Sequence, residues 1–261
     1  MSNEQINYLK KIKKNKRIIL LSQIIIVIVF FTLWELFARY NIINSFIFSK
    51  PSDIFITIIN LINKGNLFSH IFTTLYEILI SFILGITLGF IIAVFLYQYP
   101  TLAKIIDPFL TMLNSLPKVA LGPLIIIIMG ANIKSVITMA LLINLIISII
   151  TIYNGFINTD INKLKLLDTF KASKKQILFK LIIPESYKTI ISSLKLNISM
   201  SQIGVIMGEF LVSKKGIGYL IIYGTQVFNL NLVMTGILLL VIISFVLYKI
   251  VLKIEKILLS L

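Results

Sequence analysis

Few residues in this 261-residue sequence could carry out covalent or metal chemistry. There is no Cys, which excludes disulfides, thiolate nucleophiles, Cys-ligated zinc and iron–sulfur clusters. The single His, His70, leaves no imidazole cluster for a metal ion. We therefore expect neither a metal site nor a cofactor.

The acidic residues of the apolar regions do not suggest an enzyme either. Glu77, Asp107 and Glu209 are scattered along the sequence, and the Ser residues have no base beside them. An intramembrane enzyme is thus the least favoured class, and we expect a chain without catalytic residues.

A stripe of polar residues in a late apolar segment is the first feature that suggests a function. Ser193, Asn197, Ser201 and Glu209 recur at steps of four, with Val205 completing the row. Polar groups that face lipid are costly, so this face should meet protein or water. It could line a translocation path, or it could form hydrogen bonds between helices.

A second candidate for the path is an apolar block interrupted by helix-breaking residues. Ser115 and Pro117 precede Gly122 and Pro123, and two prolines six residues apart disrupt helical hydrogen bonding. Broken backbone at membrane depth survives where protein buries it or a water-filled cavity solvates it. The alternative is a simple kinked helix.

The elements that must position these residues are membrane helices. Hydrophobic residues make up 58% of the chain and charged residues 13%, with a mean hydropathy of +1.00. Runs long enough to cross a bilayer predict an all-α membrane protein with about six transmembrane helices. The predicted spans are near 18–38, 72–97, 104–129 (interrupted), 132–153, 187–211 and 230–252.

The charge distribution predicts how these spans are oriented. The net charge is +15, and with the N-terminus inside, 17 of the 25 Lys and Arg residues fall on the inner side and six on the outer side. This bias follows the positive-inside rule, so we expect both termini to be cytoplasmic and nucleic acid not to be a partner. Residues 1–17 form a basic tail, and 18–261 form one transmembrane domain. The apolar run after the tail is too long for a cleaved signal, so it should be a retained helix.

Two rows of small residues predict close helix packing. Gly85 and Gly89 share one helical face in the second span, and Gly204 and Gly208 share one in the fifth. Small residues let helices approach in lipid, where no hydrophobic force drives their association. The partner helix could belong to the same chain or to a second copy.

The longest predicted cytoplasmic connection, about 155–187, joins the fourth and fifth spans. Its apolar residues have helical spacing and Lys occupies the remaining positions, which predicts short amphipathic helices that end before Pro184. Such helices could lie on the membrane interface or insert into a groove on a soluble partner.

This connection resembles the EAA loop of the inner-membrane permeases of bacterial ABC importers. The resemblance rests on the stretch 165–173 and on Pro184, thirteen residues beyond the position where the family has Gly. It implies that the loop couples the permease to an ATPase. The residues it assigns to coupling are Lys165, Leu166, Leu167, Phe170, Lys171, Ala172, Ser173 and Pro184. Lys165 stands at the usual Glu position and Lys171 at the usual Gly position.

Further segments are similar to the nitrate/sulfonate/taurine group of these permeases. They include Ser115-Leu116-Pro117, and Glu209 followed by Gly216-Ile217-Gly218. The resemblance implies a bacterial inner-membrane permease that pairs with a second copy, two cytoplasmic ATPases and an extracytoplasmic binding protein. The implied solute is a sulfonate, taurine, nitrate or a vitamin precursor.

The sequence also limits, apart from any resemblance, where the energy for transport can come from. No Gly-Lys dipeptide occurs, so the phosphate-binding loop of P-loop ATPases is absent, and energy must come from a partner subunit or from an ion gradient. A gradient-driven secondary transporter is therefore the alternative function, although the sequence lacks the inverted repeats common in that class.

Overall fold

The computed structural model describes residues 3–259, with the side chains of 11–259 except those of 13 and 16. Within this range the chain is entirely helical, which confirms the predicted all-α class. The long helices are α1 (Asn3–Arg39), α4 (Leu67–Gln98), α7 (Ile133–Ile157), α10 (Ile183–Val212) and α12 (Leu230–Leu259). The shorter ones are α2 (Ser45–Phe48), α3 (Pro51–Asn63), α5 (Pro100–Ser115), η1 (Lys118–Leu121), α6 (Gly122–Met129), α8 (Ile161–Thr169), α9 (Lys174–Ile177), η2 (Leu178–Ile182) and α11 (Ile217–Gln226).

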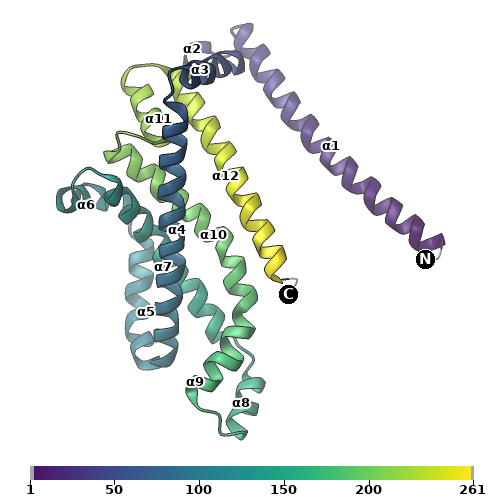
Figure 1. The fold of residues 1–261 in the computed structure, drawn as a ribbon, viewed down its shortest axis with the longest axis vertical. Helices are drawn as coiled ribbons and strands as arrows, with labels where there is room; N and C mark the ends of the chain where they lie inside the picture. Colours follow the sequence, from purple (N-terminus) through teal and green to yellow (C-terminus); the bar gives the residue numbers. More distant parts are fainter. Residues whose placement is uncertain (1–2, 260–261) are drawn as a thin grey trace.

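Three helices form the centre of the bundle. α7 packs against both α4 and α10, and α12 packs against α10 and α11 (Figure 1). The largest apolar cluster joins these helices through residues such as Ile78, Val136, Val205 and Leu240. α1 leans away from the bundle and meets it mainly at α2 and α3 (Figure 1).

Local sequence sets where the helices begin and break. Asn132 caps α7, since its side-chain oxygen accepts hydrogen bonds from the backbone N–H groups of Lys134 (2.8 Å) and Ser135 (3.3 Å). α5 ends at Ser115, directly before Leu116 and Pro117, and the chain turns by 88° into η1 and α6. The predicted interruption is therefore a sharp bend rather than a gentle kink.

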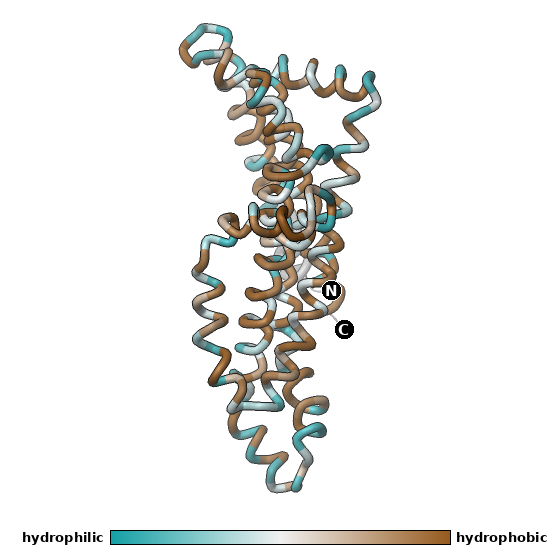
Figure 2. Tube along the Cα trace, turned by 90° about the vertical axis from the view of Figure 1, so that its left-hand side faces the viewer, coloured by the Kyte–Doolittle hydropathy of each residue, from teal (hydrophilic) through white to brown (hydrophobic). Residues whose placement is uncertain are grey.

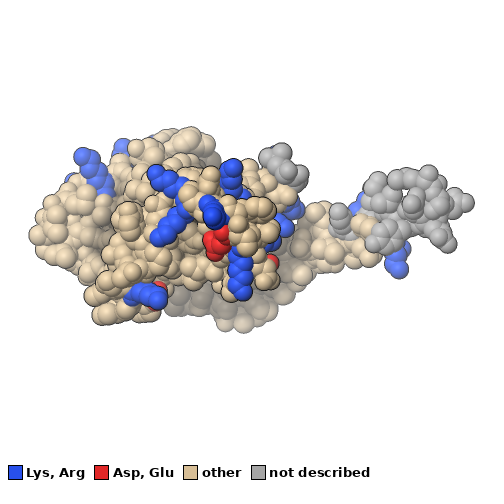
Figure 3. Space-filling model, turned by 90° about the horizontal axis from the view of Figure 1, so that it is seen from below, with Lys and Arg blue, Asp and Glu red and all other residues tan. Residues whose placement is uncertain are grey.

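The bundle has two distinct ends. One end is formed by α8 and α9, and the described ends of α1 and α12 also point in that direction; α2, α3 and α11 lie at the other end (Figure 1). Apolar residues dominate the length between the ends, with more hydrophilic segments at the tips (Figure 2). At the α8–α9 end, Lys and Arg side chains are gathered with few acidic groups among them (Figure 3).

Six helices are long and apolar enough to span a membrane, as expected, but they are not the same six. The segment Ser45–Asn63 passes this test and was not predicted as a span, while 100–129 is the bent pair described above. α3 lies across the end of the bundle at which α4 begins (Figure 1). From residue 3 on, the stretch predicted as a basic tail belongs to α1, so this part of the tail and the first span form one helix.

Candidate translocation path and coupling loop

The polar stripe of α10 faces α7 inside the same chain. Asn197 is fully buried and its side-chain oxygen accepts a hydrogen bond from Ser148 (2.6 Å). Asn144, also on α7, donates to the Ser201 hydroxyl (2.8 Å) and to the Ser81 carbonyl of α4 (3.1 Å). Ser193 is buried and donates to the Ile190 carbonyl (2.7 Å).

These contacts match the hydrogen-bonding interpretation of the stripe in this conformation. The sequence did not identify the partner residues Asn144 and Ser148. Their spacing of four in an otherwise apolar segment was the signal that could have found them.

Glu209 occupies a separate site near the other end of α10. Its two carboxyl oxygens accept hydrogen bonds from the Thr74 hydroxyl (2.6 Å) and the Gly218 backbone N–H (2.5 Å). Thr74 in turn accepts from the Ile217 backbone N–H (2.8 Å), so the start of α11 is tied to α4 and α10. A side chain at Gly216, where φ is +113°, would collide with the Glu209 carboxyl group, which explains the glycine there.

The sequence predicted that the acidic residues of the apolar regions lie apart from one another, and this prediction is wrong for one pair. Glu77 on α4 is fully buried and its carboxyl group interacts with that of Glu209 on α10. Neither oxygen of Glu77 receives a hydrogen bond from a donor in the described part of the chain. The helix periodicities of two distant segments bring the pair together, so no local pattern could reveal it.

All four glycines of the predicted packing rows lie against α7. A Cβ on Gly85 would collide with Asn144 and one on Gly89 with Ser148, while Gly204 and Gly208 abut Ala140 and Val136. Both rows thus face the interior of this chain. The absence of side chains lets both α4 and α10 approach α7 closely.

The bend between α5 and α6 leaves the other two path candidates on the surface. Ser115 and Pro117 are exposed, and Lys118 beside them is half-buried. The Lys118 ammonium group contacts the side chain of Asn114 only weakly, at 3.3 Å. Polar side chains and interrupted helical backbone within an apolar, membrane-spanning region require water or a second protein surface.

The predicted coupling loop is a compact helical unit. Asp160 caps α8 by accepting from the Asn162 backbone N–H (2.8 Å), and Lys163 forms an ion pair with Glu185 at the start of α10 (3.0 Å). Leu164 packs against a buried apolar cluster that includes Leu178 and Ile182. The loop is therefore fixed to the bundle by one face.

The opposite face of the loop carries exposed apolar side chains. Leu166 is 56% exposed and Phe170 is 73% exposed, while Leu167 and Ala172 are half-buried and Lys165 is exposed. Leu166 and Phe170 are four residues apart and so lie on one helical face. This surface could pack against a partner protein.

Local backbone geometry gives the turn between α8 and α9 its shape. Lys171 has a φ of +54°, the left-handed conformation that glycine adopts most readily. Ser173 and Gln176 form a capping box at the start of α9, with Ser173 accepting from the Gln176 N–H (3.3 Å) and donating its own N–H to the Gln176 side chain (2.8 Å). Pro184 occupies the first turn of α10, where its missing N–H is tolerated.

Comparison with known proteins decides the family. Residues 85–258 match the family described as "Binding-protein-dependent transport system inner membrane component". The chain belongs to this family. It is therefore a multi-pass permease component of a binding-protein-dependent ABC importer, and members of this family are non-catalytic membrane subunits. The family implies ATPase and binding-protein partners.

Individual relatives of this permease agree with the family match. The chain is 29% identical over 232 residues to a probable ABC transporter permease protein of Haemophilus influenzae, covering 89% of this chain and 94% of the relative. It is 26% identical to the putative aliphatic sulfonates transport permease protein SsuC of Bacillus subtilis, covering 80% and 76% of the two chains. A structure of the MetNI methionine ABC transporter in inward-facing conformations has the same fold, with 17% identity, a TM-score of 0.63 and coverage of 72% and 94%.

One further polar contact of the permease was not foreseen. Lys195 forms an ion pair with Glu255 of α12 (3.0 Å), and Ser192 donates to the same carboxylate (3.3 Å). The partner of Lys195 sits 60 residues later in the chain, which a helical periodicity within α10 could not indicate.

Proposed function

We propose that this permease works as a homodimer with two cytoplasmic ATPases and an extracytoplasmic binding protein, and imports a small solute at the expense of ATP. The observation that carries the coupling role is the exposed apolar face of Leu166 and Phe170 on a helical loop that is fixed to the bundle on its other side. Apolar surface of this kind contributes about 25 cal/mol per Å² when a partner removes it from water. The ATPase groove is the proposed occupant.

The path is proposed to run between the two copies, beside the bend that exposes Ser115 and Pro117. In support, this bend combines exposed polar residues with backbone that cannot complete helical hydrogen bonds. Ser193, Asn197, Ser201 and Glu209 form hydrogen bonds within the chain, so they would border the path only if the helices separate in another conformation.

The solute class is proposed from the relatives. SsuC is named for aliphatic sulfonates, and the Escherichia coli protein TauC, 20% identical over 224 residues, is named for taurine. A sulfonate-type solute is therefore the first to assay, followed by a vitamin precursor, because the formylaminopyrimidine permease ThiX is 26% identical over 187 residues.

The orientation is proposed to be N-in and C-in, with the α8–α9 end in the cytoplasm. The excess of Lys and Arg at that end supports it (Figure 3). Reporter fusions at Gly65 and Lys214 should read as external, and fusions at Lys174 and at the end of α12 as cytoplasmic. A cytoplasmic signal at Lys214 would contradict this topology.

The coupling role is tested by replacing Phe170 with Asp. The variant should insert normally but lose ATPase co-purification and ATP-dependent uptake, because a buried carboxylate without a partner opposes docking. Phe228→Asp is the matched control, since Phe228 is 77% exposed and lies between α11 and α12, and α11 is at the other end of the bundle (Figure 1). Normal uptake by Phe170→Asp would show that this loop does not couple. ATP-independent uptake driven by an ion gradient would favour the secondary transporter.

A further inference from the structure

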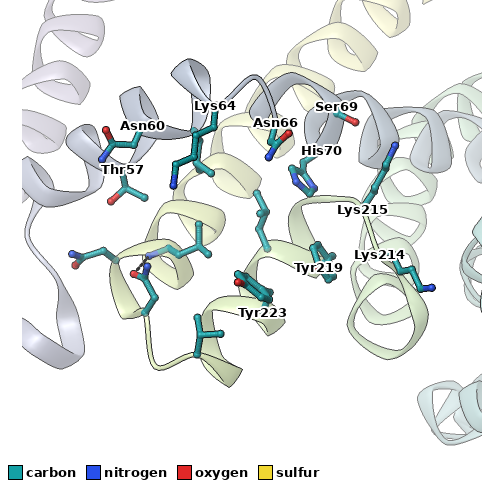
Figure 4. A pocket seen from close by; sticks show the side chains of 16 residues that line it. Thr57, Asn60, Lys64, Asn66, Ser69, His70, Lys214, Lys215, Tyr219 and Tyr223 are labelled. Atoms are coloured by element: carbon teal, nitrogen blue, oxygen red, sulfur yellow. Dashed lines mark hydrogen bonds between the residues drawn. The ribbon is translucent and has the colours of Figure 1, made fainter.

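A large hollow lies at the end of the bundle opposite the coupling loop. It has a volume of about 740 Å³ and is formed by α3, the start of α4, α11 with the segment leading into it, and the start of α12 (Figure 4). Binding sites for small molecules fall in the same range of about 300–1,000 Å³. The path and coupling residues described above do not line it.

The charge of the hollow is wholly positive. Lys64, Lys214 and Lys215 contribute to its lining, no Asp or Glu of the described residues does, and none of the three forms an ion pair there. Lys64 reaches into the space between α3 and α11, Lys215 rises toward the start of α4, and Lys214 points away on the outer flank (Figure 4). Uncompensated cations around a concave surface raise the local concentration of anions.

Polar side chains add hydrogen-bond donors to this charge. The side-chain oxygens of Asn229 and Asn231 accept from the Leu232 N–H (3.1 Å) and the Ser49 hydroxyl (2.5 Å), while their NH₂ groups have no acceptor in the described chain. His70 Nδ1 accepts from the Gly216 N–H (3.0 Å), so a neutral imidazole must carry its proton on Nε2. The lining therefore offers hydrogen-bond donors that the rest of the described chain does not use and that an anionic ligand could accept from.

One wall of the hollow is aromatic. Tyr219 stacks on His70 and on Tyr223, with ring centroids 5.9 Å apart in each case. Leu61, Leu220 and Leu232 continue this wall. Aromatic and aliphatic surface beside cations suits a ligand with an apolar body and one charged group.

We propose that this hollow is a binding site for a small organic oxyanion, a sulfonate, carboxylate or phosphate group on a short apolar body. Lys64 and the Asn amides hold the anionic group, Lys215 adds positive potential at the rim, and the Tyr219–Tyr223 wall packs against the body. The placement of the site on the extracytoplasmic side rests on the proposed function, whereas the binding itself does not. The oxyanion could be a free solute or the headgroup of an anionic lipid.

The test uses the full-length permease in nanodiscs of phosphatidylcholine and measures bound radiolabelled ethanesulfonate by equilibrium dialysis. Saturable binding should weaken with salt. Lys64→Gln should reduce affinity about tenfold or more, because it removes a hydrogen bond to a charged group, whereas Lys215→Gln should reduce it less, since that side chain acts through its charge alone. Lys50→Gln, at the opposite end of α3, is the matched control and should bind normally. The neutral isostere ethyl methyl sulfone should not compete.

A second arm identifies the source of the oxyanion. Phosphatidylglycerol in the nanodiscs should displace ethanesulfonate from wild type if a headgroup occupies the site, and should have no effect if a free solute does. Either result supports the site. Absence of saturable ethanesulfonate binding in lipid without phosphatidylglycerol, or equal competition by the sulfone, would overturn it. If ethanesulfonate does not bind, ATPase co-purification and uptake should still be normal. The two proposals can therefore fail separately.

Discussion

Thr74 on α4 donates a hydrogen bond of 2.6 Å to Glu209 on α10, 135 residues later in the chain, and accepts one of 2.8 Å from the first N–H of α11. One hydroxyl group thus joins three helices. Both partners are buried, so neither can exchange this bond for one to water.

Replacing Thr74 with Val should destabilise the permease by about 1–3 kcal/mol, because a buried carboxylate oxygen and a buried N–H both lose their partner. The thermal unfolding midpoint of the purified protein measures the loss. Thr74→Ser keeps the hydroxyl and should restore most of the midpoint. Equal midpoints for the Val and Ser variants would show that the hydroxyl contributes nothing.

Glu77 and Glu209 should respond differently to replacement by Gln. The Glu77 oxygens have no donor in the described chain, and a Gln amide there could donate to Glu209, so Glu77→Gln should be as stable as wild type or more stable. In Glu209→Gln, the NH₂ group replaces an oxygen that accepts a hydrogen bond from either the Thr74 hydroxyl or the Gly218 N–H. This variant should therefore have a lower unfolding midpoint. Strong destabilisation by Glu77→Gln alone would contradict this assignment.

Gly204→Ala should destabilise the bundle, since the new Cβ would collide with the backbone of Ala140 and force α7 and α10 apart. Such overpacking costs about 1–3 kcal/mol. Ile203→Ala is the control, because Ile203 is 46% exposed on the adjacent face and should shift the unfolding midpoint much less. If the two variants unfold alike, the close approach of these helices is not limiting.

Lys171→Gly should preserve uptake and raise stability by up to about 1 kcal/mol, because glycine adopts the observed φ of +54° without steric cost. Lys175→Gly places the same residue in the helical geometry of α9 and should reduce stability instead. Thermal unfolding and uptake assays check both. A loss of uptake in Lys171→Gly alone would mean that the Lys side chain itself contacts the partner.

The absence of native Cys makes single-cysteine labelling direct. Cys at Ser115 or Pro117 should react with a water-soluble thiol reagent if water reaches the bend, whereas Cys at Ser201 should react slowly because that position is fully buried. Cys at Ile242, exposed on α12 and expected to face lipid, controls for reaction without water. Rapid labelling at 201 in one nucleotide state would show that α10 opens to the path.

Structural features that are set by residues close together in the chain could be predicted from the sequence. The all-helical class follows from the length and number of apolar runs, since a bilayer requires about 20 residues per helix. The bend near Pro117 follows from local backbone chemistry, and the amphipathic loop before Pro184 follows from helical spacing. The family resemblance also rests on motifs within short segments, and the family match confirms it.

Only the tertiary structure decided which residues meet. It placed the α10 stripe on Asn144 and Ser148, brought Glu77 to Glu209, and gathered Lys64 and Lys215 around one hollow. Helical periodicity specifies a face but not the helix that covers it, because the rotation and neighbours of each helix depend on packing with segments far away in the chain.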